Sequence, residues 1–349
     1  MNQVRFRMPL LHDHHSHPLL YASFGDAVSL ESVTDKQQAL DLLRAQLESE
    51  KAVELTLAYG WRSHCFSWTQ HELDSLGAVA IFNVSLHDLK LSSAASERLS
   101  LLYGDDVLKV SDQVWYEQNF RKVLNWFANL NATPAALTRF YQQLEALGVY
   151  SAEELLLVDE REIELFHQAE LVDRTRFWAS PETFDTLSAA AQTHVSGCKL
   201  FTDGAIGART AALSQPYRQQ NATSCPFPQG MLVYENEELQ STIEQCLHRT
   251  PNLAIHAIGD TAIQQTVATL ERVQIPDARE IRIEHAQLIR RDVAERAKAL
   301  GVILSMQPNF NEDSWNYADR MEPSFCRLNN DFSMLIGANV TLRCGRSIL

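Results

Sequence analysis

The sequence lacks the cysteine patterns that mark disulfide-rich secreted domains and structural zinc sites. Its six cysteines lie far apart, and no two of them form a CxxC pair. Widely spaced cysteines without pairing argue against a disulfide framework and against a zinc knuckle. We therefore expect reduced thiols at all six positions, which are Cys65, Cys198, Cys225, Cys246, Cys326 and Cys344.

Long apolar runs and basic clusters are also missing. No uncharged apolar stretch reaches the roughly 18 residues that a membrane-spanning helix needs, and the N-terminus has no apolar segment typical of a secretory signal. We therefore expect a cytoplasmic protein with no membrane partner. The net charge of −14 and the absence of a Lys/Arg run argue against a nucleic-acid partner, since phosphate groups would be repelled.

Short apolar runs that end in polar residues recur along the chain, and most of the segments between them have a helical pattern. One such segment places Leu239, Ile243 and Leu247 on one helical face. Eight strands that alternate with helices predict an α/β fold, and the number eight favours a (β/α)8 TIM-like barrel over the whole chain, residues 1–349. The eight runs cover residues 7–13, 146–154, 174–180, 195–204, 252–260, 280–288, 301–309 and 338–345.

A long insertion, approximately residues 20–145, separates the first two predicted strands. It makes the chain longer than the roughly 250 residues of a typical barrel. The insertion is either a subdomain with its own core or a lid over the site, and we favour the core because aromatic side chains mostly pack. Its aromatic residues include Trp61, Phe66, Trp68, Trp115, Trp126 and Phe127.

Histidines gather at the carboxyl ends of three predicted strands, the face where barrel active sites lie. The first strand ends in HDHHSH, where strand alternation puts Asp13, His15 and His17 on one face. His256 and His285 end the fifth and sixth strands. A single histidine is often an ordinary core or loop residue, but four on strand ends around one axis predict a divalent-metal site. Zinc is the expected metal, with one or two ions.

Lys199 lies in the apolar fourth strand, where a buried ammonium is costly unless it is neutralised or paired. It could pair with Asp203 or Asp260. Alternatively, carbon dioxide could carboxylate it to a carbamate, whose two oxygens could bridge two metal ions. Glu284 directly precedes His285, so strand alternation predicts that it points away from the barrel axis.

Four segments together resemble the amidohydrolase superfamily, and specifically its YtcJ-like (amidohydrolase 3) branch. The resemblance implies that His15 and His17 bind one metal and that Lys199 bridges two metals as its carbamate. It implies that His256 and His285 bind the second metal. The implied activity is hydrolysis of an amide-type carbon–nitrogen bond in a small-molecule substrate by a metal-activated water. The four segments are HDHHSH, CKLFTDGAIGARTAAL, LAIHAIGDTAIQQTV and IRIEHAQLIRRDVAERAKALGVILSMQPNF.

The same resemblance suggests two residues on the substrate side. His87 lies in the segment NVSLHDLKLSSAA, which is similar to a substrate-contacting segment of the family. Arg209 could approach a carbonyl or carboxylate of the substrate. Both could equally be structural residues. The sequence does not select a particular amide, and it leaves a homodimer open.

The chain departs from the family pattern at both ends. Relatives carry a proton-accepting aspartate after the eighth strand, whereas this chain reads ANVTLRCGRSIL and stops. The N-terminal β-sandwich of the family is reduced to about ten residues. A truncated gene or a frameshift near Cys344 is one hypothesis for the ending. Asp203 and Asp260 are the candidate replacements for the base, although they could instead orient histidines or cap helices.

Three alternatives stay open. The first is a catalytically impaired or truncated barrel that binds metal or ligand without turnover. The second is a mononuclear deaminase, which is disfavoured because an HxxE motif is absent after His256. The third is an interaction scaffold in which the histidines bind nothing. Metal content separates this last alternative from the other two.

Overall fold

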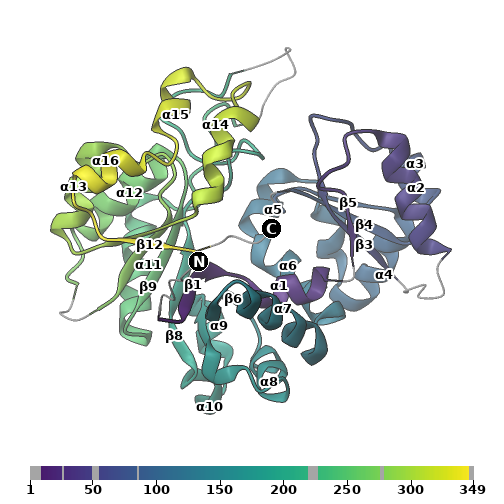
Figure 1. Ribbon diagram of the computed structural model, residues 1–349, viewed down its shortest axis with the longest axis horizontal. Coiled ribbons are helices and arrows are strands. Elements are labelled where there is room, and N and C mark those ends of the chain that lie inside the picture. Colours follow the sequence, from purple (N-terminus) through teal and green to yellow (C-terminus); the bar gives the residue numbers. More distant parts are fainter. Residues whose placement is uncertain are drawn as a thin grey trace, which may run out of the picture.

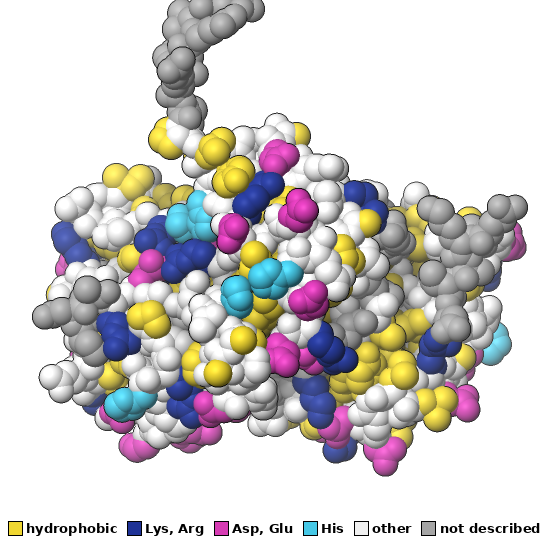
Figure 2. All heavy atoms as spheres, turned by 90° about the horizontal axis from the view of Figure 1, so that it is seen from below, with side chains coloured by type: hydrophobic (Ala, Val, Ile, Leu, Met, Phe, Trp, Pro, Cys, Tyr) yellow, Lys and Arg dark blue, Asp and Glu magenta, His cyan; other side chains and the backbone are white. Residues whose placement is uncertain are grey.

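The computed structural model describes residues 9–25, 27–48, 55–84, 86–218, 227–275 and 279–345. Five of the cysteines, Cys65, Cys198, Cys246, Cys326 and Cys344, are free thiols, as expected. Cys225 and the last four residues of the chain lie outside the described residues. In the described part of the chain, no helix is both long and apolar enough to cross a membrane. Acidic and basic side chains lie interspersed on the face shown in Figure 2.

Eight parallel strands form the main sheet, and all eight predicted strands are present (Figure 1). The two edges of the sheet approach each other closely, because a Cβ atom added to Gly345 would lie 2.3 Å from the backbone nitrogen of His15. The sheet is therefore a nearly closed barrel, which confirms the predicted fold class. In spatial order the strands are β1 (Leu11–Ser16), β6 (Val149–Leu157), β7 (Thr175–Ala179), β8 (Val195–Phe201), β9 (Leu253–Ala257), β10 (Ile281–His285), β11 (Ile303–Met306) and β12 (Leu342–Cys344).

Helices cover the outside of the barrel and bury an apolar stripe against it. Leu239, Ile243 and Leu247 of α11 are buried on one face, as their spacing predicts. They join a core cluster with the outward-facing residues of β9 and β10, such as Ile255 and Ile283. The helices of this part are α8 (Glu160–Gln168), α9 (Pro181–Thr186), α10 (Ala189–Gln192), α11 (Asn236–Arg249), α12 (Asp260–Leu270), α13 (Arg291–Ala299), α14 (Asp313–Asn316), α15 (Pro323–Leu328) and α16 (Phe332–Gly337).

The insertion between β1 and β6 contains a separate four-stranded mixed sheet in the order β2-β3-β4-β5. It lies beside the barrel in Figure 1. Trp61, Trp126 and Phe127 are buried in its two apolar clusters, which supports the prediction of a core. Its elements are α1 (Pro18–Phe24), β2 (Val28–Ser29), α2 (Lys36–Leu47), β3 (Thr56–Trp61), α3 (Gln70–Asp74), β4 (Val79–Asn83), β5 (Leu89–Leu91), α4 (Ser93–Tyr103), α5 (Gln113–Gln118), α6 (Phe120–Asn131) and α7 (Pro134–Ala146).

The interior of the barrel holds a buried network of charged side chains. Arg282 is fully buried, and its guanidinium forms ion pairs with Glu153 at 2.9 Å and with Glu284 at 2.8 Å. Its guanidinium also lies 4.4 Å from the ring centre of Trp178. Each charge is thus buried together with an opposite charge, which is the condition for tolerating it away from water.

Glu284 therefore faces the barrel interior, and the prediction that it points away from the axis was wrong. The prediction counted alternation back from His285. However, His285 has a φ of +70°, in the left-handed region, so regular alternation ends there. Arg282 and Glu284 share the inner face, and the left-handed turn brings the next side chain, His285, to the cavity as well.

We predict that Arg282→Met lowers the free energy of unfolding by about 3–5 kcal/mol, because it leaves the buried carboxylate of Glu284 without its cation and Glu153 with Arg176 alone. Urea denaturation measures this change. The control is Arg291→Met, which removes an exposed arginine whose nearest carboxylate, on Glu295, is 3.9 Å away. Surface changes of this kind usually stay within about 0.5 kcal/mol. A loss below 1 kcal/mol for Arg282→Met would show that the network contributes little to stability.

Candidate functional site

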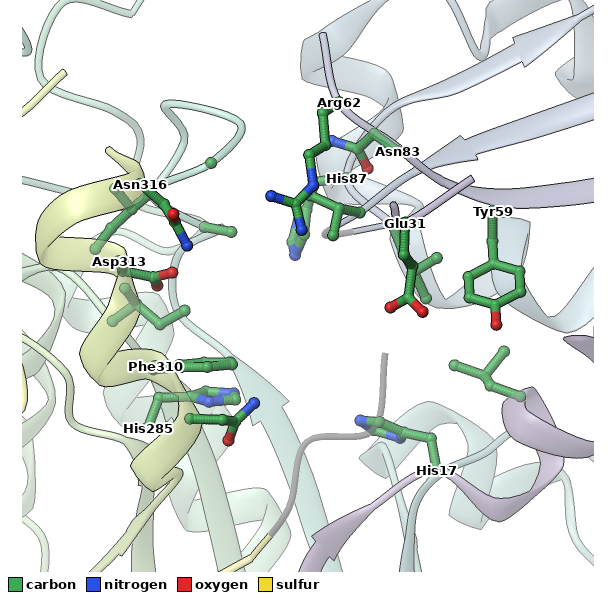
Figure 3. Close-up of a pocket in the computed structure, with 18 of the residues that line it drawn as sticks. His17, Glu31, Tyr59, Arg62, Asn83, His87, His285, Phe310, Asp313 and Asn316 are labelled. Atoms are coloured by element: carbon green, nitrogen blue, oxygen red, sulfur yellow. The ribbon is translucent and has the colours of Figure 1, made fainter. Parts of the chain in front are cut away.

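A cavity of about 660 Å³ lies at the carboxyl ends of the barrel strands. Its volume suits a small-molecule ligand. The barrel contributes residues such as His17, His285 and Phe310, and the insertion contributes residues such as Arg62 and His87 (Figure 3). The insertion therefore forms one wall of the cavity, in addition to having its own core.

The structure brings the four predicted histidines together at this cavity. The ring centres of His15 and His285 are 4.5 Å apart, and those of His256 and His285 are 4.6 Å apart. His17 lies 5.4 Å from His15 by the same measure. Lys199, on β8, is buried close enough to lower the pKa of three of these histidines. The five side chains that the sequence predicts as metal ligands thus form one cluster.

Three of these histidines use one ring nitrogen for a hydrogen bond to the protein. Nδ1 of His15 is 2.6 Å from Oε2 of Glu284, and Nδ1 of His285 is 2.6 Å from Oε1 of Gln307. Nε2 of His256 is 3.1 Å from the carbonyl oxygen of Gly204. Each bond fixes the orientation of its ring and leaves the other nitrogen for a ligand. Metal-binding histidines in proteins are usually held in this way.

Three histidines of the cluster, His15, His256 and His285, are neutral. Burial lowers the pKa of His15, His256 and His285 well below 6.5, and the neighbouring Lys199 and other histidines lower it further. The buried Nδ1 atom of His17 has no hydrogen-bond partner among the described residues. Neutral imidazoles are the form that binds zinc and similar ions. The donor set therefore fits a divalent metal.

The histidine-rich motif does not alternate regularly, because β1 contains a register shift between Asp13 and Ser16. The side chain of Asp13 turns back to accept a hydrogen bond from the backbone nitrogen of His15 at 3.1 Å. The adjacent residues His14 and His15 contact different glutamates: His14 approaches Glu153, and His15 approaches Glu284. The simple expectation of one shared face for Asp13, His15 and His17 does not describe this bulged segment.

Sequence reasoning missed a second group that could hold a metal ion, namely His12, His14 and Glu153. Nε2 of His12 and Nδ1 of His14 lie 3.0 and 3.2 Å from Oε1 of Glu153. The spacing of the two histidines was visible in the sequence, but nothing marked Glu153 as their partner. Arg176 and Arg282 also bind this carboxylate, and their positive charges oppose the entry of a cation.

The charge state of Glu153 follows from the same contacts. Burial opposes its ionisation, but hydrogen bonds from His12 and His14 and the charge of Arg282 together hold its pKa well below the usual value. The carboxylate is therefore ionised and already neutralised by its protein partners. This group is a weaker candidate for a metal than the four histidines at the cavity.

The two aspartates considered as bases are both occupied by structural contacts. The carboxylate of Asp203 accepts hydrogen bonds from the backbone nitrogens of Ala212, Ile258 and Gly259 at 2.8–3.0 Å. Burial raises its pKa to about 7, and these three bonds act in the opposite direction.

Asp260 accepts a hydrogen bond from the hydroxyl of Ser214 at 2.6 Å and is ion-paired with Arg290. Neither Asp203 nor Asp260 lines the cavity. Asp203 lies 3.5 Å from His256, so its contacts suit the alternative role of orienting the strand ends and that histidine.

The two predicted substrate-side residues have different positions. His87 lines the cavity, with Nδ1 2.8 Å from Oε2 of Glu117 and its ring stacked on Phe120 at 4.4 Å. Arg209 lines a smaller neighbouring cavity of about 550 Å³, and its guanidinium donates to the carbonyl oxygen of Arg218 at 3.0 Å.

Comparisons with known proteins show what this chain is similar to. A model of the amidohydrolase family matches residues 5–343. The YtcJ protein of Bacillus subtilis (strain 168) is 32% identical over 133 residues, which are 36% of this chain and 24% of that protein. The protein LONG AFTER FAR-RED 3 of Arabidopsis thaliana is 30% identical over 119 residues, which are 33% of this chain and 20% of that protein. The matched segments thus span a quarter or less of these curated relatives.

Two solved structures are similar over nearly the whole chain. An uncharacterized metal-dependent hydrolase from Pyrococcus horikoshii has a TM-score of 0.71 and 26% identity, covering 97% of this chain and 70% of that one. An uncharacterized metal-dependent hydrolase from Pyrococcus furiosus has a TM-score of 0.68 and 24% identity, covering 97% and 73%.

We predict that the cavity histidines, and not those beside Glu153, determine metal affinity. Replacing His256 and His285 together with alanine should weaken zinc binding by about tenfold or more, a cost already reached by removing groups that only orient a ligand. Replacing His12 and His14 with alanine is the matched control and should retain most of the metal. Metal analysis after dialysis measures both. Metal loss confined to the control variant would move the site to Glu153.

Proposed function

Because the chain belongs to the amidohydrolase family, we propose that it is a metal-dependent hydrolase that cleaves an amide-type carbon–nitrogen bond in a small molecule. One observation carries this proposal. Three buried, neutral imidazoles, those of His15, His256 and His285, converge at one cavity beside Lys199. The cavity volume of about 660 Å³ supports a small-molecule substrate.

In this proposal, His15 and His17 would hold one divalent ion and His256 and His285 a second, and Lys199 would contribute to both as its carbamate. Zinc is the expected metal. A bound zinc ion would lower the pKa of a water molecule so that it could attack a carbonyl carbon at neutral pH. Glu284 and Gln307 keep the rings of His15 and His285 in position through their Nδ1 atoms.

Several residues shape the space above this cluster. Phe310 stacks on His285 with ring centres 5.5 Å apart, so it covers one face of that ligand and limits the access of water to it (Figure 3). His87, fixed by Glu117 and Phe120, presents a ring on the opposite, insertion-side wall. We propose that His87 contacts the substrate from this wall.

Proton transfer requires a carboxylate that faces the cavity, and we propose Asp313 for this role instead of Asp203 or Asp260. Asp313 lines the cavity at the start of α14 and accepts a hydrogen bond from Gln287 at 2.7 Å (Figure 3). Burial raises its pKa to about 6. A base with a pKa just below neutral is deprotonated at pH 7 and still accepts protons readily.

We predict that activity depends on bound metal. Removal of metal with a chelator should abolish hydrolysis of amide substrates, and added zinc should restore it, because the neutral histidines alone supply no activated water. A screen of small amides with metal-loaded and chelated protein measures this. Bound metal without turnover on any amide would instead favour the second candidate, a barrel that binds without catalysis, which the lack of a carboxylate at positions 342–345 also favours.

We further predict that Asp313→Asn lowers kcat by about 10²–10⁴-fold, the usual contribution of a positioned base. In the unmodified protein, kcat/KM should fall as the pH drops through about 6, because the base becomes protonated. This inflection should be missing from the variant. The control is Asp319→Asn, which removes a more exposed carboxylate six residues away. An unchanged pH profile in Asp313→Asn would exclude Asp313 as the base.

A further inference from the structure

Two arginines from distant parts of the chain meet on the wall of the cavity. Arg62 directly follows β3 in the insertion, and Arg320 lies between α14 and α15 on the barrel side. In Figure 3 the guanidinium of Arg62 points into the cavity. Neither residue belongs to a motif in the sequence.

Each of these arginines has a buried Nε–H group for which the described residues offer no acceptor. Arg320 is only 7% exposed and donates a hydrogen bond to the carbonyl oxygen of Gly207, but its buried Nε has no hydrogen-bond partner among the described residues. The buried Nε of Arg62 also has none within that part of the chain. The guanidinium of Arg320 is buried and that of Arg62 is partly buried. A buried guanidinium is costly unless it is paired, so the unmet donor of Arg320 favours an anionic ligand.

The nearest carboxylate does not fill this role. Oδ1 of Asp319 lies 3.8 Å from Nε of Arg320, beyond hydrogen-bond distance, and the side chain of Asp319 is 37% exposed. A partly exposed ion pair at this distance contributes little. Arg320 thus retains positive charge that can act on a ligand in the cavity.

The two positive charges act on the same neighbours. Burial lowers the pKa of His64, and the charges of Arg320 and Arg62 lower it further. Burial raises the pKa of Tyr317, and the same two arginines act in the opposite direction. His64, two residues after Arg62, and Arg320 both line this cavity and its smaller neighbour, so the two arginines lie on the same part of the wall.

We propose that Arg62 and Arg320 form a carboxylate-binding subsite, and that the substrate is an amide that carries a carboxylate, as an N-acylated amino acid does. The substrate part of this proposal rests on the proposed function. The planar fork of a guanidinium matches the two oxygens of a carboxylate. The cavity walls also carry Glu31, Glu312 and Asp313, which would repel a doubly charged phosphate more strongly than a singly charged carboxylate.

Arg62 and Arg320 take the role of binding a carboxylate that the sequence suggested for Arg209. Arg209 was expected near a carbonyl or carboxylate of the substrate, but it lines the neighbouring cavity and donates to Arg218. Its positive charge is one of the influences that lower the pKa of Arg320. Arg209 therefore adds to the positive potential around the subsite without contacting the proposed ligand.

The test measures binding of two matched probes that lack the scissile carbon–nitrogen bond. The first is 4-oxo-4-phenylbutanoate, in which a methylene group replaces the amide nitrogen of N-benzoylglycine, and the second is its uncharged methyl ester. Isothermal titration of the metal-loaded protein should show that the acid binds about ten- to a hundredfold more tightly than the ester, as expected for a hydrogen-bonded ion pair. Equal affinities, or no binding of the acid, would overturn the subsite.

Three variants test whether Arg62 and Arg320 cause the preference for the acid over the ester. Arg62→Met and Arg320→Lys should each reduce the acid-over-ester ratio by about tenfold, because the first removes a charge and the second removes the planar fork. Arg62→Met breaks no hydrogen bond of the buried Nε atom, because that atom has no partner among the described residues. Arg320→Lys retains a donor for the carbonyl oxygen of Gly207, so both variants should fold. Arg291→Met, outside the cavity, should leave the ratio unchanged. A ratio that persists in both cavity variants would exclude these arginines.

The outcome is separable from that of the proposed function, because binding is measured without turnover. A preference for the acid without hydrolysis of any amide would remove the proposed function and keep the subsite. Hydrolysis of amides without a preference for the carboxylate would keep the proposed function and remove the subsite.

Discussion

The orientation of the candidate metal ligands depends on a buried ion network in the barrel. Arg282 is fully buried and lies between Glu153 and Glu284, which are also fully buried. The second oxygen of Glu284 receives the Nδ1 hydrogen of His15 at 2.6 Å. The ion pair between Arg282 and Glu284 therefore helps to hold the ring of His15 in place at the cavity. Without Arg282, Glu284 would be a buried charge whose remaining partner, His15, is neutral. Its loss would therefore lower the stability of the fold and disturb the orientation of the His15 ring.

The cluster at the cavity contains neutral histidines and Lys199, and the charge on this lysine affects whether a metal ion can bind. His15, His256 and His285 are neutral, and an ammonium group on Lys199 is one cause of their lowered pKa values. The same positive charge would repel a divalent cation in a site shielded from water. Carboxylation of Lys199 would convert a positive into a negative charge. Carbamate formation and metal binding would then favour each other, as linked equilibria must.

The sequence predicted the elements with local signatures and missed the contacts that depend on tertiary arrangement. The eight strands and the buried face of α11 follow from periodicity, and the four histidines follow from their positions at strand ends. Glu284 was misplaced because the left-handed φ of His285 cannot be read from alternation. Arg62 and Asp313 had no signal, since they follow strands of two different sheets. Only the packing of the insertion against the barrel brings them to one cavity.

The bulge in β1 explains why a six-residue motif carries so many histidines. Regular alternation would send neighbouring side chains to opposite faces of the sheet, but the register shift after Asp13 lets residues on both sides of it serve the barrel. His12 and His14 bind Glu153, while His15 reaches Glu284 and His285. Because Arg282 joins the two glutamates, His12, His14 and His15 all contact one connected network of buried charges. The motif thus supplies ligands and stabilises the network that orients them.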